Sequence, residues 1–105
     1  MTDDDIKRKP AYTTTECDIM LEEALVFMEE KSPKQAEIML EKFRIIKNLL
    51  ETFPEIGTIY KNGLRKFPLG KFRYFIYYRE KEDIIEIVGI WHTSRGTEFV
   101  ESAET

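Results

Sequence analysis

The sequence predicts an α+β fold with two layers, in which an N-terminal antiparallel helix hairpin packs on one face of a small, mostly antiparallel β-sheet. Two observations lead to this prediction. Apolar residues recur every three or four positions through residues 15–53, which is the period of an amphipathic helix. Beyond Pro54 the chain changes to short runs of β-branched and aromatic residues separated by turn residues, as strands require. Helices that precede a run of strands favour segregated layers.

The first helix is predicted to begin near Thr15. Threonines at positions 13–15 offer N-caps, and Glu16 and Asp18 place negative charge in the first turn, where the helix dipole favours it. One face of this helix is expected to be buried because its apolar residues fall mostly three or four apart: Met20, Leu21, Ala24, Leu25, Phe27 and Met28.

The second helix has a sharper start signal. Ser32 is the predicted N-cap, Pro33 fills the first helical position, and Gln35 completes a capping box. The helix is expected to stop before Pro54, and the short joint at residues 31–33 makes the two helices a hairpin. Its predicted apolar stripe is Ala36, Met39, Leu40, Phe43, Ile46, Leu49, Leu50 and Phe53.

Strands are predicted over residues 64–67, 72–78 and 84–91, and an edge strand over residues 7–13. An Asn62-Gly63 turn signal precedes the first of these, and a charged loop makes the last two a hairpin. Period two places Arg73 and Arg79 on one face of the strand 72–79, opposite the face of Tyr74, Ile76 and Tyr78. In the last strand it places His92 with Val88 and Ile90, and Trp91 with Ile85 and Ile87.

Composition and length favour a single domain that spans residues 1–105, with a core over about residues 10–96 and flexible tails. The chain is 42% apolar and 34% charged, which is a globular balance. Its apolar runs are far too short for a membrane helix and its start lacks a signal-peptide pattern, so a cytoplasmic protein is expected. With only Cys17 and His92, the chain offers no disulfide or zinc site of its own, and no cofactor is expected.

The charge of the chain is unevenly distributed. The net charge is −4 overall, but residues 61–79 carry six basic and no acidic side chains. Such a basic island attracts an acidic partner or a nucleic acid even when the whole protein is acidic. A solvated strand surface is the alternative explanation of the same charges.

A phosphodiester-cleaving site is one hypothesis for the residues around this island. Cleavage by a ribose hydroxyl needs a base, an acid and cations that neutralise the phosphorane. His92 suits the role of base or acid, and a tyrosine such as Tyr77 or Tyr78 would serve as the second proton carrier only with a lowered pKa. Arginines would hold the phosphate. Composition alone favours the alternative, which is a hydrogen-bonded histidine with core tyrosines and solvated arginines.

Residues 63–96 resemble the C-terminal half of the RelE and ParE superfamily of bacterial type II toxins. That superfamily has an Arg-bearing strand, a G-x-[FY]-R-x-[FY]-I-x-Y strand and a last strand that ends in H-x-x-R. The matching residues here are Arg65, then Gly70, Phe72, Arg73, Phe75, Ile76 and Tyr78, then His92 and Arg95. The F-P-E-I-G segment at residues 53–57 is also similar, so the resemblance extends over about residues 10–96 and implies the RelE/ParE toxin fold.

The hairpin sequence Y-R-E-K-E-D and the ending W-H-T-S-R look more like the ParE branch. That branch implies a toxin that inhibits DNA gyrase by protein contact, is neutralised by a cognate antitoxin and forms a hetero-oligomer with it. The target-binding residues are then expected to be Arg65, Lys66, Lys71, Arg73, Arg79 and Arg95.

Besides a pure protein-binding module, in which an amphipathic segment of the family's antitoxin would cover exposed apolar residues of the helix hairpin, two alternatives stay open. The RelE branch implies a ribosome-dependent, metal-independent mRNA endonuclease, for which the catalytic residues would be His92, Arg65, Arg73 and Tyr78. The RelE-type tyrosine near the C-terminus is missing, since residues 96–105 contain none. A degenerate member that keeps the fold without toxicity is the other alternative.

Overall fold

The computed structural model describes residues 8–95, so most of the two predicted tails lies outside the described residues. Its two helices are α1 (Thr15–Lys31) and α2 (Pro33–Thr52). Thr14 caps α1 by accepting a hydrogen bond from the Cys17 amide, and Ser32 caps α2 by accepting one from the Gln35 amide. Both helix starts and the hairpin joint are therefore confirmed.

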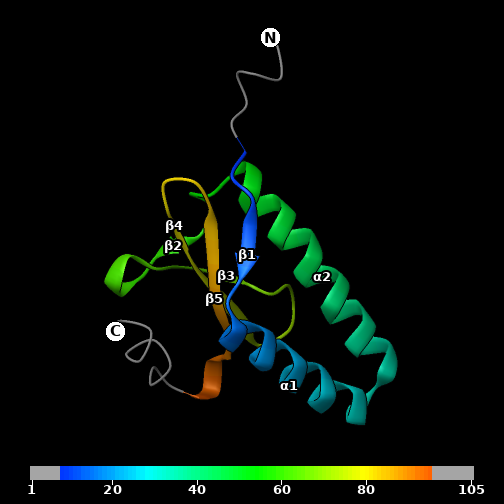
Figure 1. Ribbon diagram of the computed structural model, residues 1–105. Helices are drawn as coiled ribbons and strands as arrows, with labels where there is room; N and C mark the ends of the chain where they lie inside the picture. Colours follow the sequence, from blue (N-terminus) through cyan, green and yellow to red (C-terminus); the bar gives the residue numbers. More distant parts are fainter. Residues whose placement is uncertain (1–7, 96–105) are drawn as a thin grey trace.

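The helices cover one face of a five-stranded sheet (Figure 1). The strands are β1 (Ala11–Thr13), β2 (Thr58–Ile59), β3 (Arg65–Pro68), β4 (Tyr74–Glu80) and β5 (Ile85–His92). They lie in the order β1-β5-β4-β3-β2, with β1 parallel to β5 and the other pairs antiparallel. The α+β fold class is confirmed. Among the described residues, no helix is long and apolar enough to cross a membrane.

Strand β2 was not among the predicted strands, because two residues are too few to show a period. It pairs with β3 through the short 3-10 turn η2 (Lys61–Gly63), where Asn62 and Gly63 both have positive φ, 65° and 75°. These angles are the ones that Asn-Gly favours in tight hairpins, so the turn signal at this position is confirmed.

Strand β4 begins two residues later than predicted. Phe72 and Arg73 lie in the turn after β3, where the Phe72 amide donates to the Leu69 carbonyl oxygen at 3.1 Å. Arg73 therefore lies just outside the strand, and its predicted shared face with Arg79 stays a prediction.

A β-bulge in β5 also changes the predicted faces of the last strand, although His92 and Ile90 share a face as predicted. Tyr77 pairs with Gly89 but Tyr78 pairs with Ile87, so Val88 is an extra residue that reverses the alternation. Val88 belongs to the cluster on the outer face of the sheet, whereas Ile87 and Ile90 both pack in the core under the helices. Trp91 consequently shares the outer face with Val88, and His92 faces the helix side.

The main core lies between the helices and the sheet. Its centre is formed by Met39 and Leu50 of α2 and Ile76, Tyr78 and Ile87 of the sheet, all fully buried. Leu49 and Phe53, which were predicted in the buried stripe of α2, are instead 36% and 54% exposed. A second, smaller cluster on the outer face joins Leu64, Tyr77 and Val88 with the partly buried Tyr60, Phe75 and Trp91.

Candidate functional site

The outer face of the sheet carries a mixed basic and aromatic surface, which we call the outer sheet surface: Tyr60, Lys61, Lys66, Phe75 and Trp91. The Lys66 ammonium lies 5.0 Å from the centroid of the Tyr60 ring and 4.6 Å from that of Phe75. Tyr60 stands edge-on to Tyr77 with ring centroids 5.6 Å apart. The cation is thus held between two rings, on the face of the sheet opposite the main core under α1 and α2. Tyr60 was missed as a site residue, although it directly precedes the basic island.

Arg65, the residue before Lys66 in β3, forms hydrogen bonds with its own chain. Its guanidinium Nη1 donates to the Gly57 carbonyl oxygen at 2.8 Å and to the Glu55 carbonyl oxygen at 3.2 Å. These bonds tie the segment after α2 to β3. The half-buried arginine is therefore largely engaged by its own chain.

Tyr78, directly opposite Arg65 in the sheet, holds the same segment. Its hydroxyl donates to the Pro54 carbonyl oxygen at 2.7 Å and accepts from the Gly57 amide at 2.9 Å. Burial of the side chain raises the pKa of Tyr78. The nuclease hypothesis needs a tyrosine with a lowered pKa, and Tyr78 has the opposite shift.

His92 and Arg73 lie at the other end of β4. His92 pairs with Tyr74, and the Thr93 amide donates to the Arg73 carbonyl oxygen at 2.9 Å. Tyr74 and Tyr78 are four residues apart on β4, which corresponds to about 13 Å along a strand. The four predicted catalytic residues therefore form two separate pairs, Arg65 with Tyr78 and Arg73 with His92.

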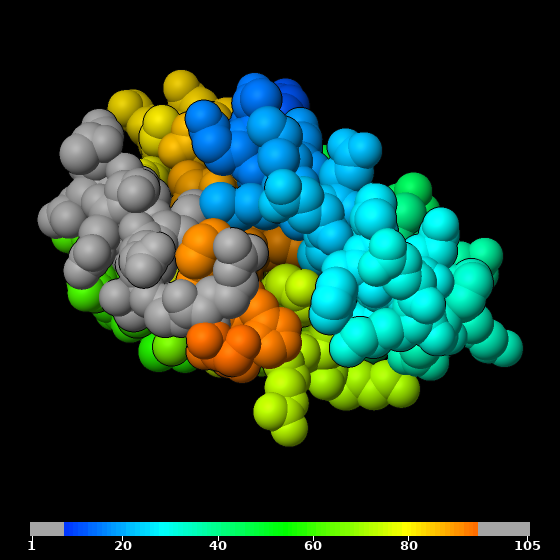
Figure 2. Space-filling view, turned by 90° about the horizontal axis from the view of Figure 1, so that it is seen from below, coloured from blue at the N-terminus to red at the C-terminus, as the bar shows by residue number. Residues whose placement is uncertain are grey.

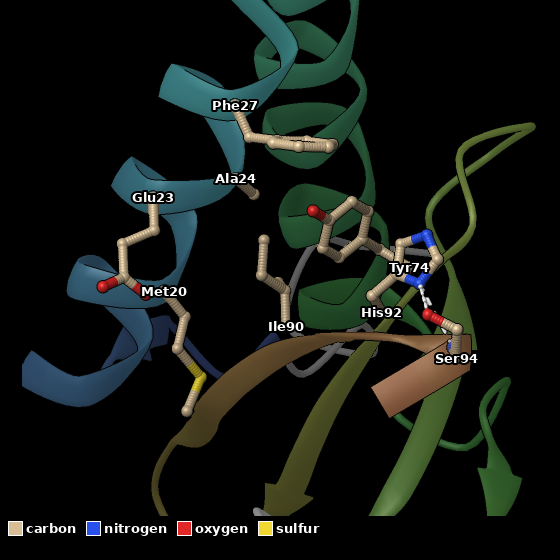
Figure 3. A pocket seen from close by; sticks show the side chains of 8 residues that line it. All are labelled: Met20, Glu23, Ala24, Phe27, Tyr74, Ile90, His92 and Ser94. Atoms are coloured by element: carbon tan, nitrogen blue, oxygen red, sulfur yellow. Dashed lines mark hydrogen bonds between the residues drawn. The ribbon is translucent and has the colours of Figure 1, made fainter. Parts of the chain in front are cut away.

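The ring of His92 is oriented by its neighbours (Figure 3). The Ser94 amide donates to Nδ1 at 3.1 Å, and Ser94 Oγ lies 2.7 Å from the same nitrogen. Because an amide can only donate, we infer that Nδ1 carries the lone pair and Nε2 carries the hydrogen. The ring packs edge-on against Tyr74 at 5.0 Å between centroids.

The other predicted target-binding residues differ in how available their charges are. Lys71 and Arg73 are exposed in the turn between β3 and β4. Arg79 is half-buried, with its Nε 3.6 Å from a carboxylate oxygen of Glu86. Arg95 ends the 3-10 turn η3 (Thr93–Arg95), which follows β5 directly. Lys71 and Arg73 are therefore better placed to meet a partner than the half-buried Arg65, Lys66 and Arg79.

The family described as the ParE toxin of the type II toxin–antitoxin system parDE matches residues 20–96. The chain belongs to the ParE toxin family. The match includes most of α1, all of α2, strands β2 to β5 and every predicted target-binding residue, so it confirms the resemblance to the RelE/ParE superfamily on its ParE side.

A solved structure of the chromosomal ParDE toxin–antitoxin system from P. aeruginosa agrees with the ParE fold. It superposes with a TM-score of 0.72 over 82% of this chain and 97% of that chain, at 16% sequence identity. At this identity the likeness establishes the fold. No curated protein matches the sequence. Neither the family match nor the structural match favours the RelE branch.

Proposed function

We propose that this ParE-family toxin inhibits DNA gyrase by protein contact and is neutralised by a cognate antitoxin, with which it forms a hetero-oligomer. Membership of the ParE toxin family over residues 20–96 carries the proposal. Gyrase acts on chromosomal DNA, so the site of action is the bacterial cytoplasm. The contact needs no cofactor or metal.

The gyrase contact is assigned to the outer sheet surface and the adjoining basic turn. Lys66 stands between Tyr60 and Phe75, and Lys71 and Arg73 are exposed nearby in sequence. Aromatic rings and arginine are the residue types that concentrate binding energy in protein interfaces, and the lysines add a positive field that attracts an acidic partner. Arg79 adds to the positive field, and Arg65 holds β3 to the segment after α2 through the Glu55 and Gly57 carbonyl groups. Arg95 stays a predicted contact residue.

The test is DNA supercoiling by purified gyrase with the toxin added at increasing concentration. Inhibition with trapped, cleaved DNA is expected. Lys66→Glu and Arg73→Glu should each weaken inhibition at least tenfold, because each reverses a charge at the contact. Lys34→Glu is the matched control, since it makes the same charge change at an exposed position of α2. Absence of inhibition by folded wild-type protein would refute the proposal.

His92→Ala separates gyrase inhibition from RNA cleavage. On the gyrase proposal this change leaves inhibition within about twofold of wild type, because His92 is oriented toward the helix side. A nuclease would lose about 10²- to 10⁴-fold in rate with its acid–base group removed. Cleavage of ribosome-bound mRNA by the wild type, lost in His92→Ala, would therefore count against the gyrase proposal.

Antitoxin pairing has its own test. A small reading frame next to the toxin gene should encode a protein that co-purifies with the toxin and restores supercoiling when added to the inhibited reaction. A neighbouring product that binds without restoring supercoiling would contradict neutralisation.

A further inference from the structure

A pocket of about 340 Å³ lies between α1 and the ends of β4 and β5. Figure 2 shows α1 (blue to cyan) next to the end of β5 and η3 (orange), the elements between which the pocket lies. Sites for small molecules typically have volumes of about 300–1,000 Å³. The pocket is at the lower end of this range, so its volume suits a molecule about the size of a single amino acid.

The walls of the pocket are mostly apolar and include two aromatic rings. In Figure 3 the Phe27 ring lies across one end of the pocket, and the Tyr74 ring lies on the side opposite α1. Met20 and the buried Ile90 also line the pocket. Aromatic rings favour edge-on or offset contact with another ring, and their faces attract cations. These walls therefore favour a ligand that has an aromatic body.

Glu23 is the acidic residue of the pocket. Among the lining residues that the structure describes, no other is acidic and none is a lysine or an arginine. Within residues 8–95 its carboxylate forms no ion pair, whereas the glutamates at positions 51, 80 and 86 are each paired with a basic residue. A carboxylate beside two aromatic rings favours a cationic group on the ligand.

His92 gives the pocket a fixed polar wall. Its Nδ1 accepts a hydrogen bond from the Ser94 amide, and its ring packs edge-on against Tyr74. The imidazole is therefore held in one orientation where it lines the pocket. A ligand in the pocket would change the surroundings of a ring that is already in place.

We propose that this pocket binds a small arylalkylamine, with the aromatic ring against Phe27 and Tyr74 and the ammonium group beside Glu23. Contact with the apolar walls removes the ring from water. The ammonium group pairs with the carboxylate at the edge of the pocket, where Glu23 is exposed. The ion pair thus stays in contact with water, which keeps its desolvation cost low.

The pocket is separate from the surface proposed for gyrase. Tyr74 and Ile90 pack on the helix side of the sheet, whereas Tyr60, Phe75 and Trp91 belong to the cluster on the outer face. The inference does not rest on gyrase inhibition, and either result of the supercoiling assay leaves it unchanged.

Titration of the full chain with 2-phenylethylamine, followed by proton NMR, tests the proposal. His92 is the only histidine in the sequence, so its ring signals report on the pocket directly. They should shift until binding saturates and should show nuclear Overhauser contacts to the ring protons of the amine. The compounds 2-phenylethanol and 3-phenylpropionate carry the same ring with a neutral and a negative end. Each should bind at least about fivefold more weakly than the amine.

Glu23→Gln should weaken binding of 2-phenylethylamine at least about fivefold and leave binding of 2-phenylethanol within about twofold of wild type, because it removes charge without changing shape. Glu29→Gln is the matched control, since Glu29 is an exposed glutamate of the same helix that does not line the pocket. It should change the affinity of the amine by less than about twofold.

Equal weakening by Glu23→Gln and Glu29→Gln would mean that the amine senses only the overall charge, which would overturn the proposal. Equal affinity for the three compounds, tighter binding of 3-phenylpropionate, or no saturable shift of the His92 signals would overturn it too.

Discussion

The amide of Gly57 donates a hydrogen bond of 2.9 Å to the hydroxyl of Tyr78, and the two residues are so close that no side chain fits at position 57. A Cβ atom on Gly57 would lie 2.5 Å from the Tyr78 oxygen and 3.0 Å from the Lys66 carbonyl oxygen. The F-P-E-I-G segment is therefore bound to the sheet through a fully buried tyrosine. This contact sets where the chain leaves α2 and enters β2.

Tyr78→Phe should lower the free energy of unfolding by about 1–3 kcal/mol, because it leaves the Gly57 amide and the Pro54 carbonyl without their partner. Urea denaturation followed by circular dichroism measures the change. Tyr12→Phe is the control, since Tyr12 is 58% exposed. Equal stabilities of the two variants would show that the buried hydroxyl contributes nothing.

Gly57→Ala should also destabilise the fold, by about 1–3 kcal/mol, as overpacking of a buried site does. Combined with Tyr78→Phe, its effect should be smaller than in the wild type, because the double variant lacks the oxygen that the new Cβ would meet at 2.5 Å. A double-mutant cycle by urea denaturation measures this coupling. Strictly additive effects would contradict the proposed clash.

Arg65 and Arg73 should differ in stability effects although both belong to the predicted sites. Arg65→Ala removes the donor to the Gly57 and Glu55 carbonyls and should cost about 1–3 kcal/mol. Arg73→Ala, at an exposed turn, should stay within about 0.5 kcal/mol of wild type. Thermal unfolding of both variants checks this. Lower stability in Arg73→Ala than in Arg65→Ala would reverse the structural assignment.

Local signals in the sequence were sufficient to predict the helices. Ser32 and Pro33, for example, determine the start of α2 through contacts with near neighbours in the chain alone. The bulge at Val88 has no such signal. Period two assumes that every residue has a partner across the sheet, and one extra residue was enough to exchange the faces of Trp91 and His92. A strand of two residues, β2, carries no pattern at all.

The candidate sites depended on contacts between distant residues. Glu23 and His92 line one pocket although they are far apart in the chain, and no local pattern connects them. The basic island could be read directly from sequence, but not that Arg65 is engaged by carbonyl groups while Lys66 lies between two rings. The number of charged side chains can be counted from a sequence. Whether a charged side chain is free to contact a partner depends on how the folded chain packs around it.

Cys17 should be unreactive in the folded protein. Burial, with a smaller contribution from the negative charge of Asp18, raises the pKa of the Cys17 thiol from 9.0 to about 12. Since the thiolate is the reactive form, labelling by iodoacetamide at about pH 8 should be slow in native protein and fast in denaturant. Rapid labelling of native protein would contradict the burial of this side chain.

The same shift predicts a pH dependence of stability. The folded state favours the protonated thiol of Cys17. The contribution of this thiol to the free energy of unfolding is therefore complete below the unfolded pKa of about 9, and it is lost as the pH rises toward 12. The free energy of unfolding should fall between these values, and it should fall less steeply in Cys17→Ala. Because the pKa values of Tyr77 and Tyr78 are also raised by burial, a residual alkaline decline remains in that variant. Only the difference between the two pH profiles reports on Cys17, and identical slopes would mean that the thiol does not ionise on unfolding.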